Sequence, residues 1–233
     1  MNSPQLTETQ ARDEICRVGK SLFDRGYIHA TAGNISVRLA DDQGGGLLIT
    51  PGEACLGFLD PATLARIDAA GQQASGDRAS KTLALHLGIY RAAARFDDQT
   101  RCVIHSHSAH CVALSMGPAS PELLPPLTPY FVMKVGHVPR IGYSRPGSAS
   151  AVEEVARTIA RYGDSGRPIR AVMLDRLGPN VWHDSPANAV AVLEELEETA
   201  RLMFLPAQPG GAAAEPLTEP QIDELRQSFG ARW

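Results

Sequence analysis

Two histidines stand one residue apart at the end of a short apolar run. His105 and His107 follow Cys102-Val103-Ile104, a run with the character of a strand. Side chains at positions i and i+2 of a strand point to the same side, so both imidazoles can reach one metal ion. Neutral imidazole binds zinc, iron and similar ions. A hydrogen-bonded structural pair explains the same pattern, so the motif leaves both interpretations open.

A second group of polar residues lies in a loop of small residues. The run Thr31-Ala32-Gly33-Asn34-Ile35-Ser36 enters an expected strand. Such a loop can present backbone N–H groups, together with the side chains of Thr31 and Asn34, to an anion. A plain tight turn before the strand has the same composition. The sequence therefore offers an anion site here without requiring one.

The elements that position these residues alternate between helices and short strands. Apolar residues recur at helical spacing in several stretches, and Pro186 after Ser185 is a typical helix start. The expected helices span residues 9–24, 82–95, 149–161 and 186–205, and the expected strands span 35–39, 47–50, 102–104, 171–174 and 180–182. This mixture predicts an α/β protein with a three-layer α/β/α arrangement. The acidic cluster at residues 194–198 is expected to be a solvated face.

Length and composition predict one domain over residues 1–233, with a linker at 206–216 and a C-terminal helix at 218–230. A net charge of −4, from 22 basic and 26 acidic residues, argues against nucleic-acid binding. No apolar run approaches the length of a membrane span. The first residues do not resemble a secretion signal, so we expect a cytoplasmic protein without membrane partners.

Several motifs occur together in a fixed order along the chain. They are Thr31–Ser36, Ile49-Thr50-Pro51, Ser80 followed by a helix with His86, His105-Ser106-His107, Tyr130 and Gly178-Pro179. Together they resemble the class II aldolase/adducin family over residues 8–205. The stretches 127–136, 145–147 and 194–200 are similar to the 3-oxo-tetronate 4-phosphate decarboxylase branch of that family.

The resemblance implies an α/β/α fold around a mainly antiparallel sheet, a homotetramer, and active sites between neighbouring subunits. Three histidines of the family hold a divalent metal, typically zinc, which acts as a Lewis acid when a carbon–carbon bond breaks. A glutamate beside the metal moves protons, and a tyrosine of the adjacent subunit protonates an oxyanion. The substrates are small phosphorylated molecules, held by backbone and hydroxyl groups.

The family pattern carries over to most of the expected positions. His105 and His107 match the first two metal ligands, and Tyr130 matches the tyrosine that acts across subunits. Lys81 stands where a cation suits a carboxylate or phosphate. Three residues match the phosphate-binding loops: Thr31, Asn34 and Ser80.

Three positions depart from the pattern. Thr82 stands at the catalytic position of the glutamate, and threonine cannot act as a base near pH 7. Leu177 stands where the third histidine would directly precede Gly178, and leucine cannot bind a metal. Glu53 stands in a phosphate loop that usually reads Thr-Pro-Thr-Gly, where its carboxylate would repel a phosphate. Glu53 is a substrate-binding candidate, and its carboxylate indicates a substrate that lacks the phosphate.

These departures leave three hypotheses. The first is a carbon–carbon lyase that decarboxylates or cleaves a small hydroxy-keto acid, with His105 and His107 on the metal and Lys81 on the acid group. In it, Asp175 is a candidate third ligand, because a strand would turn it the same way as residue 177. The second is a repurposed enzyme of the same fold with a non-phosphorylated substrate and an altered or absent metal. The third is a non-catalytic binding protein like the adducin head domains.

Overall fold

A single eight-stranded sheet forms the centre of the computed structural model, which describes residues 6–205 and 214–233. The strand order is β4-β3-β2-β1-β5-β8-β7-β6. Neighbouring strands are antiparallel except β6 and β7, which are parallel. The strands are β1 (Asn34–Arg38), β2 (Leu47–Ile49), β3 (Ala65–Ile67), β4 (Gln73–Ser75), β5 (Cys102–His105), β6 (Arg140–Ile141), β7 (Ala171–Leu174) and β8 (Gly178–His183). The expected mainly antiparallel sheet is confirmed.

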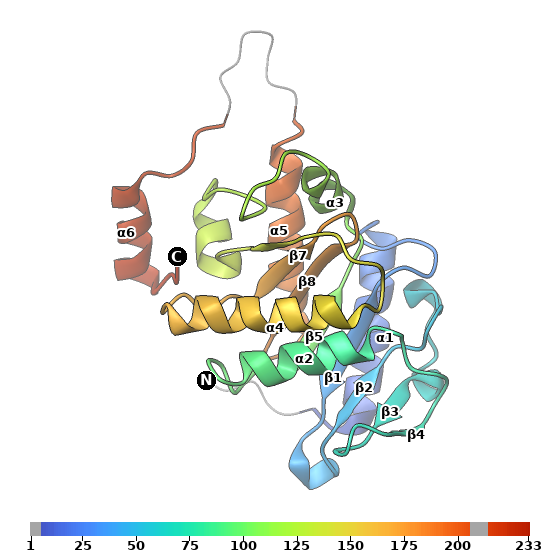
Figure 1. The fold of residues 1–233 in the computed structure, drawn as a ribbon. Helices are drawn as coiled ribbons and strands as arrows, with labels where there is room; N and C mark the ends of the chain where they lie inside the picture. The colour runs from blue at the N-terminus through green and yellow to red at the C-terminus, as the bar shows by residue number, and fades with distance from the viewer. Residues whose placement is uncertain (1–5, 206–213) are drawn as a thin grey trace.

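Helices cover both faces of the sheet (Figure 1). They are α1 (Glu8–Asp24), α2 (Leu83–Ala93), α3 (Ala109–Ser115), α4 (Ala149–Asp164), α5 (Pro186–Leu202) and α6 (Glu219–Phe229). α2 and α4 pack against each other on one face, and α1, α3 and α5 lie on the other. The three-layer arrangement expected from the sequence is confirmed. Within the described residues, none of the helices has the length and apolar composition needed to cross a bilayer.

Each face of the sheet buries its own apolar core, because alternate residues of a strand point to opposite faces. On β5, Cys102 and Ile104 pack with α1 and α5, whereas Val103 packs with α2 and α4. His105 therefore lies on the α2–α4 face. The strand register puts Asn34 of β1 and Asn180 of β8 directly opposite His105, so three polar side chains line up across the sheet.

The predicted elements match the observed ones within a few residues, apart from four short ones. β3, β4, β6 and α3 were not expected; β4 is exposed along its whole length and β6 has two residues, so neither leaves an apolar pattern. α1 begins at a capping box on Thr7, and α5 begins at Ser185, whose hydroxyl accepts the N–H of Asn188. Of the predicted linker at 206–216, residues 206–213 lie outside the described residues.

The acidic cluster of α5 is not the uniform solvated face that its charges predicted. Glu197 is 3% exposed. Its carboxylate accepts the backbone N–H groups of His110 and Cys111, at 3.0 and 3.1 Å, and it lies 2.8 Å from Nδ1 of His110. The first N–H groups of a helix have no partner within it, so a carboxylate there is stabilised by hydrogen bonds and by the helix dipole. Glu197 thus fixes α3 to α5, directly after the histidine pair.

Candidate functional site

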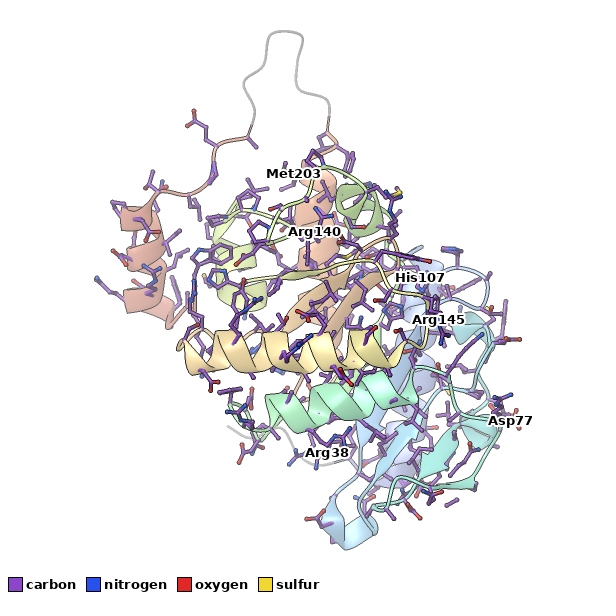
Figure 2. All side chains as sticks on the ribbon, viewed as in Figure 1. Arg38, Asp77, His107, Arg140, Arg145 and Met203 are labelled. Carbon is purple, nitrogen blue, oxygen red and sulfur yellow. The ribbon has the colours of Figure 1, made fainter. Side chains whose placement is uncertain are left out.

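A pocket of about 280 Å³ gathers most of the residues that the motifs singled out. It lies among the loops before β1 and after β2 and β5, the first turns of α2 and α4, and the β7–β8 turn. Figure 2 shows His107 and Arg145 near each other at this end of the molecule. Predicted site residues that line the pocket are Thr31, Asn34, Glu53, Ser80, Lys81, Thr82, His105 and His107.

Tyr130 does not line this pocket. It directly precedes the short π-helical turn Phe131–Val135, and it is 62% exposed. Its hydroxyl is therefore available to another molecule rather than to the pocket of its own chain. A role across subunits stays a prediction.

Asp175 does not lie with the histidines, so the structure does not support it as a third metal ligand. Residues 175–177 form the turn between β7 and β8 instead of continuing a strand, which removes the reason for Asp175 and Leu177 to point the same way. Both carboxylate oxygens of Asp175 accept hydrogen bonds from Arg140, each at 2.9 Å. Leu177, in contrast, lines the pocket.

Replacing Asp175 by alanine is expected to lower the free energy of unfolding by about 3 kcal/mol, because it leaves the largely buried Arg140 guanidinium without its carboxylate. Asp164, which pairs with Arg95 at the surface, is a matched control whose replacement should cost less than about 1 kcal/mol. Urea denaturation of both variants measures the difference. Equal losses would contradict a structural role for Asp175.

The two motif histidines form a preorganised pair. His105 is 5% exposed, and its Nδ1–H donates to the carbonyl of Pro179 at 3.1 Å, which leaves Nε2 free to accept. The ring of His107 meets it edge-on with centroids 4.9 Å apart. Burial, and next the neighbouring His107, lowers the pKa of His105 to about 3. Burial also lowers the pKa of His107. Both rings are therefore neutral at pH 7, the form that binds a metal ion or a substrate proton donor.

A buried hydrogen-bond chain fixes the amide of Asn34. Nε2 of His86 lies 2.5 Å from Oδ1 of Asn34, and Nδ1 of His86 lies 2.7 Å from the hydroxyl of Ser36. The Ser36 hydroxyl lies 2.9 Å from that of Tyr90. An amide oxygen only accepts, so this network assigns the ring proton of neutral His86 to Nε2, and Nδ1 accepts from Ser36. The NH₂ group of Asn34 is thereby left to donate into the pocket.

The stability of the protein is expected to fall below neutral pH partly because of His86. Burial, and next His105, lowers the pKa of His86 from 6.5 to about 3. Between pH 6.5 and pH 3 the unfolded chain binds a proton on His86 that the folded chain does not. Protonation of His86 in the unfolded chain therefore lowers the free energy of unfolding by about 2 kcal/mol at pH 5, and this loss disappears above pH 7. Urea unfolding at pH 7.5 and 5.0 should show a smaller pH effect for His86→Gln than for the wild type. An unchanged pH effect would count against a neutral buried His86.

Charged groups lie on two sides of the pocket. Lys81 comes from the turn just before α2 and lies 3.5 Å from the carboxylate of Glu53, with both side chains largely exposed. Arg145 comes from the loop before α4. Arg145 was not predicted as a site residue; the signal that could have identified it is its place in residues 145–147, which are part of the family resemblance. Two cations and one carboxylate give the pocket lining a net positive charge that suits an anionic ligand.

Backbone strain gathers in the loops around this pocket. Among the described residues, the non-glycine residues with positive φ are Ala30, Glu53 and Arg176. Each lies in or beside a segment that lines the pocket. A left-handed conformation costs about 1 kcal/mol for an L-residue and persists where the surrounding structure fixes it. Such strain concentrates at functional sites, in agreement with the other features of the pocket.

The histidine pair meets part of what the family metal requires. Two imidazoles on one tetrahedral zinc ion place their ring centroids about 5 Å apart, which His105 and His107 match. Leu177 offers no ligand at the third position. In the part of the chain that the structure describes, no three His, Cys, Asp or Glu side chains are grouped as a ready metal site. The residues as placed therefore supply two of the three protein ligands that a catalytic zinc ion usually has.

Comparisons with known proteins agree with this geometry. The family described as "Class II Aldolase and Adducin N-terminal domain" matches residues 13–204. A curated relative named 3-oxo-tetronate 4-phosphate decarboxylase, from Cupriavidus necator, is 48% identical and covers 97% of this chain and 99% of its own. A protein of the same name from Escherichia coli is 39% identical, with 94% and 96% covered.

Solved structures show the same relationship. The chain is similar to YgbL from Escherichia coli, described as a putative aldolase/epimerase/decarboxylase, with a TM-score of 0.81, 38% identity, and 94% and 99% of the two chains covered. It is also similar to l-fuculose-1-phosphate aldolase from Thermus thermophilus, with a TM-score of 0.66, 29% identity, and 83% and 92% covered. The sequence match, the fold and the residues of the pocket together place this chain in the class II aldolase and adducin N-terminal domain family, nearest its 3-oxo-tetronate 4-phosphate decarboxylase branch.

Proposed function

We propose that the protein is a carbon–carbon lyase that decarboxylates a 3-oxo-tetronate 4-phosphate. The observation that carries this proposal is one pocket that combines two cations, Lys81 and Arg145, with the Asn34 amide and two neutral imidazoles. Relatives with the decarboxylase name, aligned over nearly the whole chain, support the same reaction.

The reaction itself sets what the pocket must do. In a 3-oxo acid, the C1–C2 bond breaks and its electron pair forms a C2=C3 double bond, while negative charge moves to the C3 oxygen. C1 leaves as carbon dioxide, and C2 then takes a proton to give a ketotriose phosphate. The site must therefore bind two anionic ends, stabilise charge on the C3 oxygen, and deliver one proton.

The residues of the pocket divide these tasks between its two sides. Hydrogen-bond donors for the phosphate come from the loops that carry Thr31, Asn34 and Ser80. Lys81 orients the carboxylate, and Arg145 adds positive charge from the opposite side. The neutral pair His105 and His107 faces the C3 oxygen. Tyr130 of a neighbouring subunit is the proposed proton donor, which requires an oligomer, and the family points to a homotetramer.

Thr82 favours decarboxylation over aldol cleavage. Aldol cleavage requires a base to remove a hydroxyl proton, and this chain has threonine where the family base is expected. Decarboxylation produces its carbanion by losing carbon dioxide, so it needs an acid but no base at that step. The Thr82 hydroxyl lies 2.9 Å from that of Ser80, which supports a role for Thr82 beside the proposed phosphate-binding group instead.

Class II aldolases depend on a divalent metal, typically zinc. When bound, such an ion polarises the keto oxygen of the substrate as a Lewis acid. His105 and His107 would hold such an ion, whereas Leu177 has no atom that could bind it.

A panel of substrates tests the proposal. Purified protein is incubated with 3-oxo-tetronate 4-phosphate, with the same acid lacking phosphate, and with L-fuculose 1-phosphate, each with and without zinc or ferrous ions. We expect carbon dioxide and a ketotriose phosphate from the first compound alone. Turnover of the acid without phosphate would instead support the repurposed enzyme that Glu53 suggested. No turnover of any compound would contradict a lyase and favour a binding protein.

A further inference from the structure

The turn that follows Tyr130 is anchored, although the tyrosine itself is exposed. Tyr130 is 62% exposed, whereas Phe131 and Val132, which follow it, are 0% and 1% exposed. The N–H of Phe131 donates to the hydroxyl of Thr128 at 3.0 Å, and the N–H of Gly136 donates to the carbonyl of Phe131 at 2.9 Å. π-Helical turns are rare and occur often at functional sites. Tyr130 is therefore an exposed side chain on a fixed stretch of backbone.

The helix α6 packs against this turn, which lies between α5 and α6 (Figure 1). Val132 of the turn is buried together with Ile222 and Leu225 of α6. Ahead of the helix, the N–H of Leu217 donates to the carbonyl of Pro126 at 2.7 Å. The segment that contains α6 therefore holds the turn and also the chain that leads into it.

Trp233 contacts both ends of the turn through its ring. The indole meets the ring of Phe131 edge-on, with centroids 5.8 Å apart, and it stacks on His137 with centroids 4.3 Å apart. Edge-on and stacked contacts of this kind stabilise aromatic pairs. Phe131 directly follows Tyr130, and His137 comes directly after the end of the turn. One side chain thus supports the turn at its beginning and at its end.

Trp233 is itself held through both its backbone and its ring. Nε and Nη2 of Arg226 on α6 donate to the main-chain oxygen of Trp233, at 3.2 and 3.0 Å. His137, on which the indole stacks, is 7% exposed, and its Nδ1 lies 2.8 and 2.9 Å from the two carboxylate oxygens of Glu122. A carboxylate only accepts, so Nδ1 of His137 carries the proton and donates it. The indole is therefore a fixed support for Phe131.

We propose that Trp233 is a positioning residue for Tyr130, because its contacts with Phe131 and His137 fix the turn that carries the tyrosine. The inference rests on the proposed function, in which Tyr130 delivers a proton to the site of a neighbouring subunit. A proton donor must lie within hydrogen-bond reach of the atom that it protonates. A displacement of about 1 Å, caused by a change far from the chemistry, can lower a rate by about 100-fold. An exposed donor depends for this precision on the residues beneath it.

A double-mutant cycle in the decarboxylation assay tests the proposal. Tyr130→Phe should lower kcat by about 100-fold or more, the usual contribution of a general acid. Trp233→Ala should lower kcat by about 10–100-fold and change KM by less than about twofold, because the donor acts only in the transition state. The double variant should be no slower than Tyr130→Phe alone, since no donor is then left to position. Trp233→Phe keeps an aromatic ring and should recover most of the activity.

The matched control is Phe229→Ala on the same helix, which removes an aromatic ring that is 66% exposed. This variant should keep the kcat and KM of the wild type. Circular dichroism and light scattering show whether each variant keeps the fold and the assembly of the wild type. If Trp233→Ala does not fold, Trp233→Leu, which keeps an apolar side chain, takes its place in the cycle.

The outcomes separate this inference from the proposed function. Losses that multiply in the double variant would overturn the positioning role, and so would a loss of activity in Trp233→Ala that comes from an altered assembly. A fully active Trp233→Ala, or a fully active Tyr130→Phe, would overturn the inference and leave decarboxylation standing. A folded wild type that releases no carbon dioxide would overturn the proposed function, and the inference with it.

Discussion

Replacement of Lys81 by methionine is expected to lower kcat/KM for 3-oxo-tetronate 4-phosphate by about 10–100-fold. Lys81 lines the pocket from the turn before α2, and among the described residues its only ion pair is with the exposed Glu53 at 3.5 Å. Its charge is therefore available to a substrate anion, and one charge-assisted hydrogen bond contributes about 1.5–3 kcal/mol. Methionine keeps most of the length of the side chain and removes only the charge.

Lys20→Met is the matched control for this experiment. Lys20 forms a similarly exposed ion pair with Asp24 on α1, outside the pocket. Steady-state kinetics with both variants separate a substrate contact from a general effect of charge. If the two variants keep equal, wild-type kcat/KM values, Lys81 does not bind the substrate.

Replacement of Gly178 by alanine should have the largest effect on stability. Gly178 has φ +143°, and a Cβ atom there would lie 1.9 Å from the carbonyl oxygen of Ser106. A backbone oxygen cannot move aside as a flexible side chain does, so the turn before β8 would be forced away from the segment that carries His107. Overpacking and an unfavourable backbone conformation together should cost about 3 kcal/mol or more.

The control for Gly178 is Gly166→Ala. Gly166 also has a positive φ, +78°, but apart from its own chain neighbours no heavy atom lies within 4 Å of the position of its Cβ. This variant should lose only about 1 kcal/mol, the cost of the left-handed conformation. Urea denaturation measures both. Similar losses would mean that the close approach of Gly178 to Ser106 does not limit stability.

Local patterns were sufficient to predict the parts of the site that depend on short stretches of sequence. The strand before His105, the loop Thr31–Ser36 and the helix that follows Ser80 each carry their own signal of apolar spacing or small residues. The order of these motifs then indicated the family, and with it the meeting of distant loops in one pocket. The meeting of these loops could be predicted only from the resemblance to the family, because hydrophobic periodicity alone does not specify which loops meet.

Contacts between distant residues could not be predicted in the same way. Asp175 was expected to face the histidines, but a turn replaces the strand and Arg140, 35 residues earlier, binds its carboxylate. Glu197 was expected in solvent, but it caps α3, 87 residues earlier.

The proposed decarboxylation is tested most directly by following the carboxyl carbon of 3-oxo-tetronate 4-phosphate labelled with ¹³C at C1. We expect the wild type to release the label as carbon dioxide in equal amount to the ketotriose phosphate formed. We also expect Arg145→Met, in the pocket, to lose most of this activity, whereas Arg157→Met, on the exposed side of α4, keeps it. Label retained in the acid by folded wild-type protein, with and without added zinc or ferrous ions, would contradict the assignment of this pocket as a decarboxylase site.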